Sequence, residues 1–546
     1  MTNVVLIAGS REQLVPKLQG AFGDVRVLDV DDFCGSPRVA DPAAKYIYLP
    51  VAADADGLTP DEQQAQRVLQ VVARSGGRQF VLLSSALIYG TGHGRHALVD
   101  ESYSLPGHNA CSISSKWKAL ESLAGGHLAD RMPLTILRLC PVPGSGMFPA
   151  RLFSRRVAAI LPGHDPVFQF LSVSDLANAI LSVLEQTAPG IFNVAPQTVV
   201  PLRAAMRAVN SAGLAFPRSL QRALRPAESL QFLRYSWTIS GEKMRRELGF
   251  APRHSSLSAL VAAGNGRPQK KEEETEFDLF GMDKDYIRFF GKTLFRFLRD
   301  YYWRIEDAGI ENIPSSGPAV LTGMHRGFMP LDGVMALDTV VKLTGRYPRF
   351  LTHPALLKFP FLANFMTKLG GVVACQASAD RILQDNGLLG IFPEGISGAF
   401  TDYRNAYKLH AFGRDAFVKI ALRHRAPIVP FVTVGSAEIF PILGKIKSRR
   451  WTRYTDWPCI PITPTFPLVP LPLPSKWHTQ FLPPVRTDCY PPEAAEDRKV
   501  VQAISREVRN SMQQAIDDML SRRRSIFFGS IFKQPGDADH RRSLPV

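Results

Sequence analysis

The N-terminal part of the chain alternates short apolar runs with stretches of helical period. The runs are VVLIAG (4–9), VRVLDVDD (25–32), KYIYLPVA (45–52), RQFVLLSSA (78–86) and LTILRLCPV (134–142). Apolar strands that each lead into a helix are typical of a parallel sheet covered by helices. We therefore expect an α/β fold, with a Rossmann-like doubly wound parallel sheet in this part of the chain.

The C-terminal part carries further apolar runs, among them AVLTG (319–323) and APIVPFVTVG (426–435), which predict the strands of a second α/β domain. A charged run without apolar residues, GRPQKKEEETE (266–276), separates the two parts and is typical of a solvated linker. We predict an N-terminal domain over 1–265, this linker, a second domain over 277–530 and a flexible tail over 531–546.

Residues 282–305 have helical period, with four cations at successive i+4 steps beside an apolar stripe. Such a helix suits a membrane interface, with rings at the acyl boundary and cations at anionic headgroups. The pattern fits equally well a helix that packs on its own domain and has a solvated basic face. The cations are Lys284, Arg288, Lys292 and Arg296, and the stripe is Ile287, Phe290, Leu294, Leu298 and Tyr301.

Composition narrows the class of partner. Of the 546 residues 45% are hydrophobic, which excludes a disordered or fibrous protein. Lys and Arg (65) exceed Asp and Glu (49), and more than half of the net charge of +16 lies after residue 265. Nucleic acid, a membrane surface or a phosphorylated substrate would each explain this excess. We expect no nucleic acid, because no recognised binding motif accompanies the charge.

Targeting and metal signals are absent from the sequence. The six cysteines form no C-x-x-C pair, which fits a reducing compartment and predicts no metal site. The N-terminus lacks a basic region and a cleavage site, so we expect no signal peptide. The longest uncharged stretch, 457–475, contains seven prolines, which a spanning helix cannot accommodate. We expect peripheral attachment at the cytoplasmic face of a membrane, without a transmembrane helix.

Five segments of the N-terminal part form a recognisable set: SSALIYG (84–90), DESYSLPG (100–107), the segment ending in Lys116, VSDLANAI (173–180) and GIFNVAP (190–196). Over about residues 3–250 the chain resembles the extended short-chain dehydrogenase/reductase family, in its group of sugar-nucleotide epimerases and dehydratases. The resemblance implies a dinucleotide-binding fold in which Gly9 ends the first strand and Asp29 stands where a ribose-binding acid belongs. Ser85 and Lys116 would hold a ligand.

Two departures from that family concern its chemistry. The family's glycine-rich turn lets the backbone approach a pyrophosphate, but here Glu12 and Val15 follow Gly9 at the glycine spacings. The family's Tyr-x-x-x-Lys pair is Ser112-x-x-x-Lys116 here, and a serine hydroxyl titrates far too high to replace a phenol. We expect a structural or ligand-sensing domain without redox activity, and both departures argue against NAD(P) binding.

The second domain places candidate catalytic residues after its predicted strands. AVLTG delivers His325 into a loop, and Asp332 follows seven residues later. Further along, the apolar run GLLGI precedes a Phe-Pro-Glu-Gly turn that contains Glu394 and Gly395. A histidine and a carboxylate after one strand, with this turn after another, have few explanations other than a catalytic site.

This combination resembles the glycerolipid acyltransferase family over about residues 278–528, nearest its monoacylglycerol and diacylglycerol acyltransferase-like branch. The resemblance implies direct transfer of a fatty acyl group from acyl-CoA or acyl-carrier protein to a hydroxyl, with no cofactor and no covalent enzyme intermediate. His325 would act as general base, and Asp332 would orient the imidazole and stabilise the imidazolium. Glu394 and Gly395 would shape the acceptor site, with backbone amides available to an oxyanion or a phosphate.

Three departures from this second family bear on its site. Met324 stands where many relatives have asparagine, and the spacing from histidine to aspartate is longer. The arginine that often follows the Phe-Pro-Glu-Gly block is absent, and residues 396–398 read Ile-Ser-Gly. A neutral acceptor such as an acylglycerol or a long-chain alcohol then becomes as plausible as a lysophosphatidate. Arg381 or Arg404 would be the substitute cation for a phosphate.

Two runs near the C-terminus bear on the membrane. Prolines at every third residue from Pro458 to Pro470 have the period of a polyproline II helix. They predict a stiff apolar rim near the acyl entrance or a segment that covers the sheet edge. The run KIKSRRWTR (445–453) mixes five cations with one tryptophan. It fits a loop that faces headgroups, a solvated loop or a patch that faces nucleic acid.

The leading hypothesis is a membrane-associated O-acyltransferase that acylates a glycerolipid hydroxyl, of a lysophospholipid or a mono- or diacylglycerol, in lipid biosynthesis. Its partners would be membrane lipids and acyl-CoA or acyl-carrier protein, and the N-terminal domain would dock, position or sense a ligand. One alternative is a non-catalytic lipid- or nucleotide-binding scaffold, which the intact His325, Asp332 and Glu394 disfavour. The other is an NAD(P)-dependent sugar-nucleotide epimerase or reductase, which Ser112 disfavours.

Overall fold

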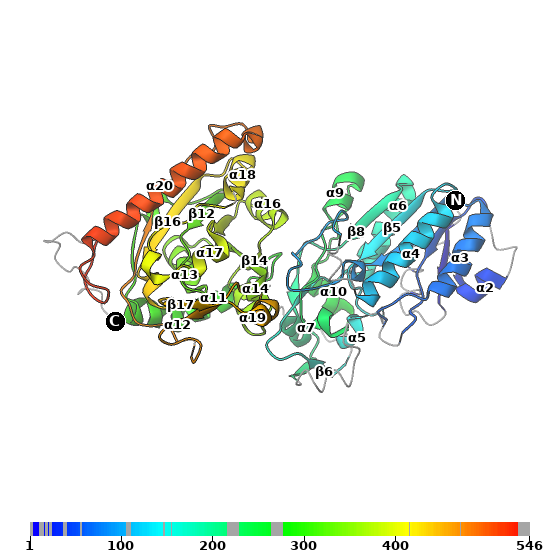
Figure 1. Cartoon of the computed structure of the whole chain (residues 1–546). Coiled ribbons are helices and arrows are strands. Elements are labelled where there is room, and N and C mark those ends of the chain that lie inside the picture. The colour runs from blue at the N-terminus through cyan, green and yellow to red at the C-terminus, as the bar shows by residue number, and fades with distance from the viewer. Residues whose placement is uncertain are drawn as a thin grey trace, which may run out of the picture. The chain divides into compact units, whose positions relative to one another are not determined.

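The computed structural model divides the chain into two compact units, which we describe one at a time (Figure 1). The first is Met1–Met282 with Phe359–Phe365, and the second is Asp283–Lys358 with Met366–Val546. The predicted linker and all but two residues of the predicted tail lie outside the described residues. The structure describes residues 4–9, 16, 20, 25–35, 41–54, 57–104, 111–145, 148–153, 155–215, 229–263, 277–413, 415–469 and 471–532.

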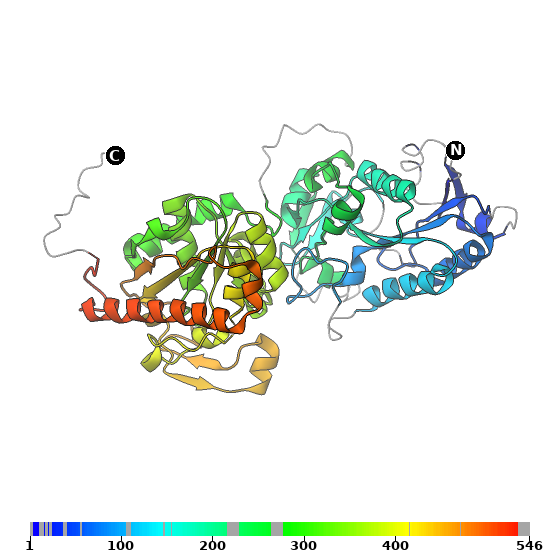
Figure 2. The same ribbon diagram turned by 90° about the horizontal axis from the view of Figure 1, so that it is seen from above.

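A six-stranded parallel sheet forms the core of the N-terminal unit. In sheet order its strands are β2 (Arg26–Asp29), β1 (Val4–Ala8), β3 (Lys45–Tyr48), β4 (Gln79–Ser85), β5 (Leu134–Leu139) and β8 (Gly190–Val194). Helices cover both faces of the sheet (Figure 2), so its central strands are almost fully buried. The predicted Rossmann-like doubly wound sheet is confirmed.

The helices of this unit begin and end at ordinary capping signals. The carboxylate of Asp61 accepts the N–H of Gln64 at the start of α3 (Glu62–Ser75), and Gly76 ends that helix with a φ of 68°. The other elements are α2 (Val30–Gly35), η2 (Ala86–Tyr89), α4 (Ser112–Leu128), α5 (Ala150–Phe153), β6 (Val157–Ile160), β7 (Val167–Phe168), α6 (Val173–Gln186), β9 (Val200–Pro201), α7 (Leu202–Ala208), β10 (Ala212–Ala215), η4 (Ser229–Leu233), α9 (Glu242–Leu248) and α10 (Ser256–Ala263).

A seven-stranded sheet forms the core of the C-terminal unit, which is also α/β as predicted. In sheet order its strands are β11 (Glu306–Ala308), β19 (His478–Phe481), β16 (Ile428–Val434), β12 (Ala319–Gly323), β15 (Leu388–Ile391), β13 (Arg349–Thr352) and β14 (Gly371–Val373). Neighbouring strands run parallel except β16 and β19, which are antiparallel. A separate antiparallel hairpin pairs β17 (Gly444–Ile446) with β18 (Ile460–Ile462).

Helices and short turns complete the C-terminal unit. Among the described residues, no helix is both long enough and apolar enough to cross a bilayer. The elements are α13 (Leu331–Thr344), α14 (Pro354–Leu357), α16 (Gln376–Gln384), α17 (Gly395–Ala399), α18 (Ala416–Arg423), α19 (Arg449–Thr455), α20 (Arg498–Arg522), η6 (Ile310–Asn312), η7 (Tyr403–Asn405), η8 (Ser436–Glu438) and η9 (Pro492–Glu496). Of α15 (Leu362–Lys368), only the part from Met366 onward belongs to this unit.

The prediction of one continuous helix over 282–305 is wrong. The segment forms α11 (Lys284–Lys292), α12 (Leu294–Phe297) and a π-helical turn, η5 (Leu298–Tyr302). The backbone leaves helical geometry at Thr293, where φ is −116° and ψ is −98°. The expected apolar stripe is consequently divided between the interior and the surface.

Arg299 gives a physical reason for this irregular end. It lies in η5, is buried, and donates from Nη1 to Asp307 at 2.6 Å and from Nε to Asp338 at 2.8 Å. Burial raises the pKa of Asp338, and the neighbouring guanidinium opposes that rise. A π-helical turn places the arginine between these carboxylates, at the cost of a continuous stripe.

The two basic and proline-rich runs also differ from expectation. The run over 445–453 ends strand β17 and forms most of α19, so it is not simply a loop. Within the proline run, 460–462 pairs with β17 as strand β18, and a turn follows at 466–468. Hydrogen bonding across the hairpin thus replaces an uninterrupted polyproline II helix in this part of the chain.

The register of the central strands determines where the candidate site lies. Thr322 of β12 is opposite Ile391 of β15, so the two strands end at the same level. The residues that follow, 323–325 and 392–395, therefore leave the sheet side by side. In open α/β sheets this carboxyl edge is where ligands bind.

Gly323 ends β12 where two aromatic rings close over it. A Cβ at this position would collide with Cζ of Phe431 and lie 2.7 Å from Cε1 of Phe392. We expect Gly323→Ala to lower the free energy of unfolding by about 1–3 kcal/mol, because the rings must move. Gly444→Ala is the control, since its Cβ would meet only Ile462, at 4.0 Å. Urea unfolding midpoints measure both, and equal midpoints would contradict the packing.

Candidate active site

His325 and Asp332 meet at the carboxyl edge of the C-terminal sheet. His325 follows β12, and Asp332 lies in the first turn of α13. Nδ1 of His325 lies 2.8 Å from Oδ2 and 2.9 Å from Oδ1 of Asp332. The Asp332 carboxylate is buried and also accepts the N–H groups of Arg326 and Gly333, each at 2.8 Å. Two backbone donors and one imidazole thus hold this carboxylate in place.

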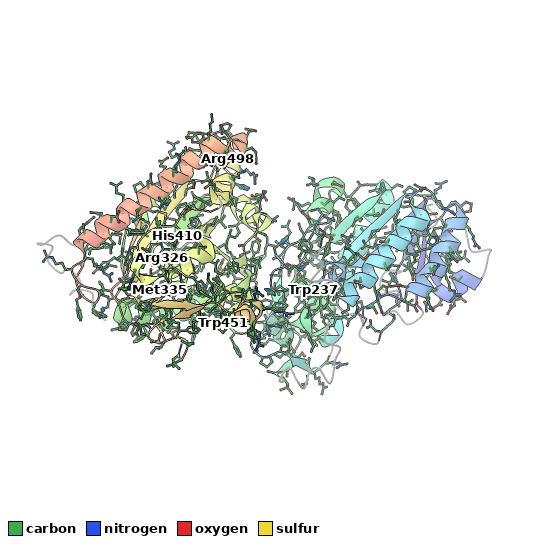
Figure 3. The ribbon with its side chains drawn as sticks, viewed as in Figure 1. Trp237, Arg326, Met335, His410, Trp451 and Arg498 are labelled. Carbon is green, nitrogen blue, oxygen red and sulfur yellow. The ribbon has the colours of Figure 1, made fainter. Side chains whose placement is uncertain are left out.

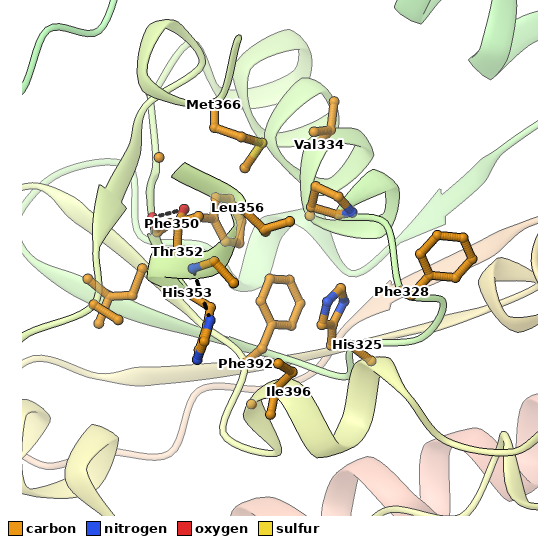
Figure 4. Close-up of a pocket in the computed structure, with 18 of the residues that line it drawn as sticks. His325, Phe328, Val334, Phe350, Thr352, His353, Leu356, Met366, Phe392 and Ile396 are labelled. Carbon is orange, nitrogen blue, oxygen red and sulfur yellow. Dashed lines mark hydrogen bonds between the residues drawn. The ribbon is translucent and has the colours of Figure 1, made fainter. Parts of the chain in front are cut away.

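This geometry fixes the tautomer of the imidazole. A carboxylate only accepts hydrogen bonds, so the proton of the neutral ring belongs on Nδ1 of His325. Nε2 then keeps its lone pair, which is the form that a general base needs. The ring also packs beside Phe392, with centroids 5.0 Å apart (Figure 4). The side chain is therefore held both by a hydrogen bond and by an aromatic contact.

A cavity of about 230 Å³ lies beside His325 (Figure 4). No lysine or arginine occurs among the described residues that line it. The second imidazole of the lining, His353, accepts the N–H of Ala355 at 3.2 Å, and burial lowers its pKa. The described lining therefore holds no lysine, arginine or carboxylate, and burial favours the neutral form of His353. Its apolar members include Phe328, Val334, Leu337, Phe350, Leu356, Met366, Phe392, Ile396, Phe400 and Trp457.

Glu394 faces Arg326, away from the cavity lining. Both side chains are buried, with Nη1 of Arg326 2.7 Å from Oε2 and Nη2 3.1 Å from Oε1 of Glu394. Glu394 also accepts the N–H of His410 at 2.8 Å. The guanidinium makes five hydrogen bonds, which matches its five N–H groups. Its remaining acceptors are the carbonyl oxygens of His325, Ala406 and Lys408.

The other predicted acceptor residues occupy separate places. Gly395 lines the cavity with a φ of 56°, but its N–H donates to the carbonyl of Phe392 at 2.9 Å. This amide differs from the expectation, because it is engaged within its own turn. Arg381 pairs with Asp385 on α16 at 3.0 Å, and Arg404 is exposed on η7. Neither arginine is among the described residues that line the cavity.

The predicted nucleotide residues lie at the carboxyl edge of the N-terminal sheet. Asp29 of β2 is opposite Ala8 of β1, and Gly9 follows directly. The Asp29 carboxylate accepts the N–H of Asp31 at 2.9 Å. Ser85 caps η2 by accepting a backbone N–H at 3.2 Å. An acid thus lies beside the first strand end, while Glu12 and Val15 are outside the described residues.

The positions of the family's tyrosine and lysine do not fit a redox-active nicotinamide site. Ser112 and Lys116 are both exposed in the first turns of α4. A buried phenol, Tyr89, does occur in this unit, and it accepts from Arg138 at 2.8 Å. Burial raises the pKa of Tyr89 to about 12, although Arg138 opposes the rise, so this phenol stays protonated. Arg138 also pairs with Glu121 at 2.7 Å, in a closed buried network.

Three residues that build the site had no role assigned from sequence. Arg326 directly follows His325, and Phe392 is the first residue of the Phe-Pro-Glu-Gly turn, so their places in the recognised motifs are the signal that could have found them. Trp457 has no such signal, because it reaches the cavity from a segment more than 60 residues beyond the Phe-Pro-Glu-Gly turn. Among the described residues, no group of His, Cys, Asp and Glu side chains is arranged to hold a metal ion.

The C-terminal half is similar to known acyltransferases. Residues 304–434 match the family model described as Acyltransferase. The uncharacterized protein Rv0502 of Mycobacterium tuberculosis is 36% identical over 285 residues, which cover 50% of this chain and 78% of that protein. Phytyl ester synthase 2 of Arabidopsis thaliana is 26% identical over 40% of this chain and 34% of its own. Acyl-CoA wax alcohol acyltransferase 1 of Mus musculus is 31% identical over 18% and 30%, respectively.

The N-terminal half matches a second family. Residues 56–195 match the model described as NAD dependent epimerase/dehydratase family. A solved UDP-glucose 4-epimerase from Bifidobacterium longum is 15% identical, with a TM-score of 0.40, and the match covers 48% of this chain and 97% of that one. The two family models thus agree with the epimerase/dehydratase and acyltransferase resemblances that the motifs indicated.

Breaking the buried ion pair should cost more stability than breaking an exposed one. Arg326→Met leaves Glu394 charged and buried without its partner, so we expect the free energy of unfolding to fall by about 3–5 kcal/mol. Arg296→Met removes the exposed ion pair with Asp300 and should change the free energy of unfolding by less than about 1 kcal/mol. The double variant Arg326→Met/Glu394→Met should be more stable than the single one. Thermal unfolding tests this, and an Arg326→Met variant as stable as the parent would contradict it.

Proposed function

We propose that this chain acylates a neutral lipid alcohol. The chain belongs to one family with the mycobacterial protein Rv0502, and its C-terminal domain is an acyltransferase. The donor is a fatty acyl thioester, either acyl-CoA or acyl-carrier protein. The acceptor is the hydroxyl of a mono- or diacylglycerol or of a long-chain alcohol. The observation that carries this proposal is the apolar cavity, with no lysine, arginine or carboxylate in its described lining, beside the hydrogen-bonded His325–Asp332 pair.

The reaction needs one general base. Nε2 of His325 takes the proton of the acceptor hydroxyl while the hydroxyl oxygen attacks the thioester carbonyl carbon. The new C–O bond forms, the C–S bond breaks, and the proton on Nε2 passes to the departing sulfur. Asp332 holds Nδ1–H and stabilises the imidazolium that exists between these transfers. We propose that no cofactor and no covalent enzyme intermediate take part.

The lining of the cavity favours a neutral acceptor over a phosphorylated one. A phosphate buried there would lose its hydration and find no cation, which is unfavourable. Glu394 is occupied by Arg326, and the two candidate cations, Arg381 and Arg404, lie elsewhere. The names of two relatives, a phytyl ester synthase and a wax alcohol acyltransferase, refer to neutral alcohols and support the same choice. Lysophospholipids are thus the less favoured part of the expected acceptor class.

The N-terminal domain has a different role in this proposal. Its exposed Ser112 and its protonated, hydrogen-bonded Tyr89 supply no acid/base for hydride transfer. We propose that it positions or senses a ligand for the acyltransferase without redox chemistry. The cytoplasmic face of a membrane, where the lipid substrates reside, is the proposed location of the whole chain.

His325→Ala removes the general base, and we expect kcat/KM for acyl transfer to fall by about 10²–10⁴-fold. Asp332→Asn should lower it as well, because an amide no longer fixes the tautomer. The control is His424→Ala, which breaks a similar His–carboxylate pair with Asp380 (2.8 Å) outside the cavity lining. That variant should stay within about twofold of the parent.

The assay for these variants uses radiolabelled acyl-CoA with monoacylglycerol, diacylglycerol, a long-chain alcohol and lysophosphatidate in parallel. We expect ester formation with the neutral acceptors and little with lysophosphatidate. Transfer that survives His325→Ala would exclude the mechanism. A preference for lysophosphatidate would exclude the neutral acceptor while leaving the base intact.

We expect neither NAD(H) nor NADP(H) to bind the full chain saturably. Tryptophan fluorescence titration measures this, and Asp29→Ala serves as the matched variant because Asp29 alone stands at the ribose position. Parent and variant should give the same unsaturable response. Saturable binding that Asp29→Ala abolishes would show an intact nucleotide site and contradict the proposal for this domain.

A further inference from the structure

Large apolar side chains are exposed on three segments of the C-terminal unit. Single exposed apolar residues are ordinary, but a gathering of this size marks an interaction site. The most exposed is Leu468, with 90% of its surface accessible. The set, which we call the apolar surface, comprises Phe289, Leu294, Phe297 and Tyr301 of α11 to η5, Leu468, Val469 and Leu471 of the loop between β18 and β19, and Phe527 and Phe528 after α20.

These segments are far apart in sequence but adjacent in space. Tyr302 donates its hydroxyl proton to the carbonyl of Pro472 at 2.7 Å, which joins η5 to the loop. Arg304 donates to the carbonyl of Phe527 at 2.7 Å and lies over the ring of Phe528. The elements α11, α12, β17 and α19 all lie along the lower side of this unit in Figure 1. The segments that carry the exposed side chains are therefore neighbours in the fold.

Cations accompany the apolar surface. Arg288, Lys292 and Arg296 are exposed on α11 and α12. A second exposed group, which we call the basic cluster, follows β17: Lys447 precedes α19, and Arg449, Arg450 and Arg453 lie on that helix. None of these four forms an ion pair with a carboxylate in the part of the chain that the structure describes, so their charge is uncompensated locally. Trp451 lies among them at the same lower edge (Figure 3).

We propose that this side of the domain docks on the surface of a bilayer that contains anionic lipid. Aromatic and aliphatic side chains on a projecting loop and an irregular helix can enter the acyl boundary, while the cations remain at the headgroups. The exposed cations beside these apolar side chains match a continuous anionic surface, which a bilayer with anionic lipid presents to every one of them at once. Charge complementarity thus selects the anionic membrane.

The same loop connects the docking surface to the cavity. The ring of Phe466 lies 4.8 Å from that of Phe328, which lines the cavity and also packs on Trp457 at 5.6 Å. Leu468 follows Phe466 by only two residues. Docking therefore brings lipid to the wall of the cavity, and this step of the proposal rests on the proposed acyl transfer to a lipid alcohol.

The test is sedimentation of the full chain with vesicles of phosphatidylcholine, alone or with phosphatidylglycerol. We expect the bound fraction to rise with the anionic lipid and to fall with added salt. Leu468→Asp/Leu471→Asp should weaken binding at least tenfold, as should Arg449→Glu/Arg450→Glu. Both pairs are exposed, so circular dichroism should show an unchanged fold.

Matched controls carry the same changes elsewhere on the protein. Arg498→Glu/Lys499→Glu alters two exposed cations at the start of α20, at the far edge of this unit from Trp451 (Figure 3). Val157→Asp introduces the same acid at an exposed apolar residue of the N-terminal unit. Both controls should bind vesicles as the parent does. Equal binding by the surface variants and the parent would overturn the proposal, as would a parent dimer that these variants dissociate.

Acyl transfer from a short-chain acyl-CoA to a soluble alcohol separates the two proposals. The docking variants should keep this soluble activity while losing activity on acceptors embedded in vesicles. If the parent binds anionic vesicles through this surface but acylates no acceptor, the acyltransferase proposal fails and the docking surface stands. If acyl transfer to the soluble alcohol depends on His325 but the surface substitutions leave vesicle binding unchanged, only the docking proposal fails.

Discussion

The buried ion pair between Arg326 and Glu394 is the interaction on which the catalytic half depends. A guanidinium inside a domain is tolerated only where carboxylate and carbonyl oxygens replace its water, and here every N–H group has such an acceptor. These oxygens come from the loop after β12, the turn after β15 and the 406–408 segment, so one side chain holds three segments together. His325 takes part through its own carbonyl, 2.7 Å from Nη1. Asp332 therefore holds the ring of His325, while Arg326 holds the backbone of His325.

This arrangement changes what the Phe-Pro-Glu-Gly turn contributes. Read as a motif, Glu394 and Gly395 suggest groups that meet the acceptor directly. In the structure the carboxylate is buried against Arg326 and the glycine amide is engaged with Phe392. The turn instead supplies the ring of Phe392, which packs beside His325. Recognition of the acceptor then falls to the apolar lining of the cavity, and this is the physical basis for proposing a neutral alcohol.

Much of this could be predicted from sequence, for identifiable reasons. The parallel strands are visible because burial on both faces demands unbroken apolar runs such as 79–85 and 428–434. The pairing of His325 with Asp332 can be predicted from sequence because both residues lie within nine residues of one strand end. The pairing of Glu394 with Arg326 cannot be predicted in this way, because the two residues are 68 positions apart in the chain. The helix break at Thr293 cannot be predicted for a similar reason. Periodicity shows which residues are apolar, but it does not show that Arg299 is buried between the carboxylates of Asp307 and Asp338.

The distribution of charge connects the interior of the protein with its surface. Arg138, Arg299, Arg326 and Arg523 are each neutralised by a carboxylate within hydrogen-bonding distance, so these cations contribute little to the field outside the protein. The basic residues in excess must then lie on the surface. The cations over 447–453 are one such group, without carboxylate partners among the described residues. Because such charges act over about one Debye length, roughly 8 Å at physiological salt, they influence only what comes close to that side of the domain. An apolar cavity and a surface with concentrated basic charge are therefore two results of one division of polar groups between interior and surface. This division is the physical basis of our two proposals, that the cavity takes hydrocarbon and that the surface meets lipid headgroups.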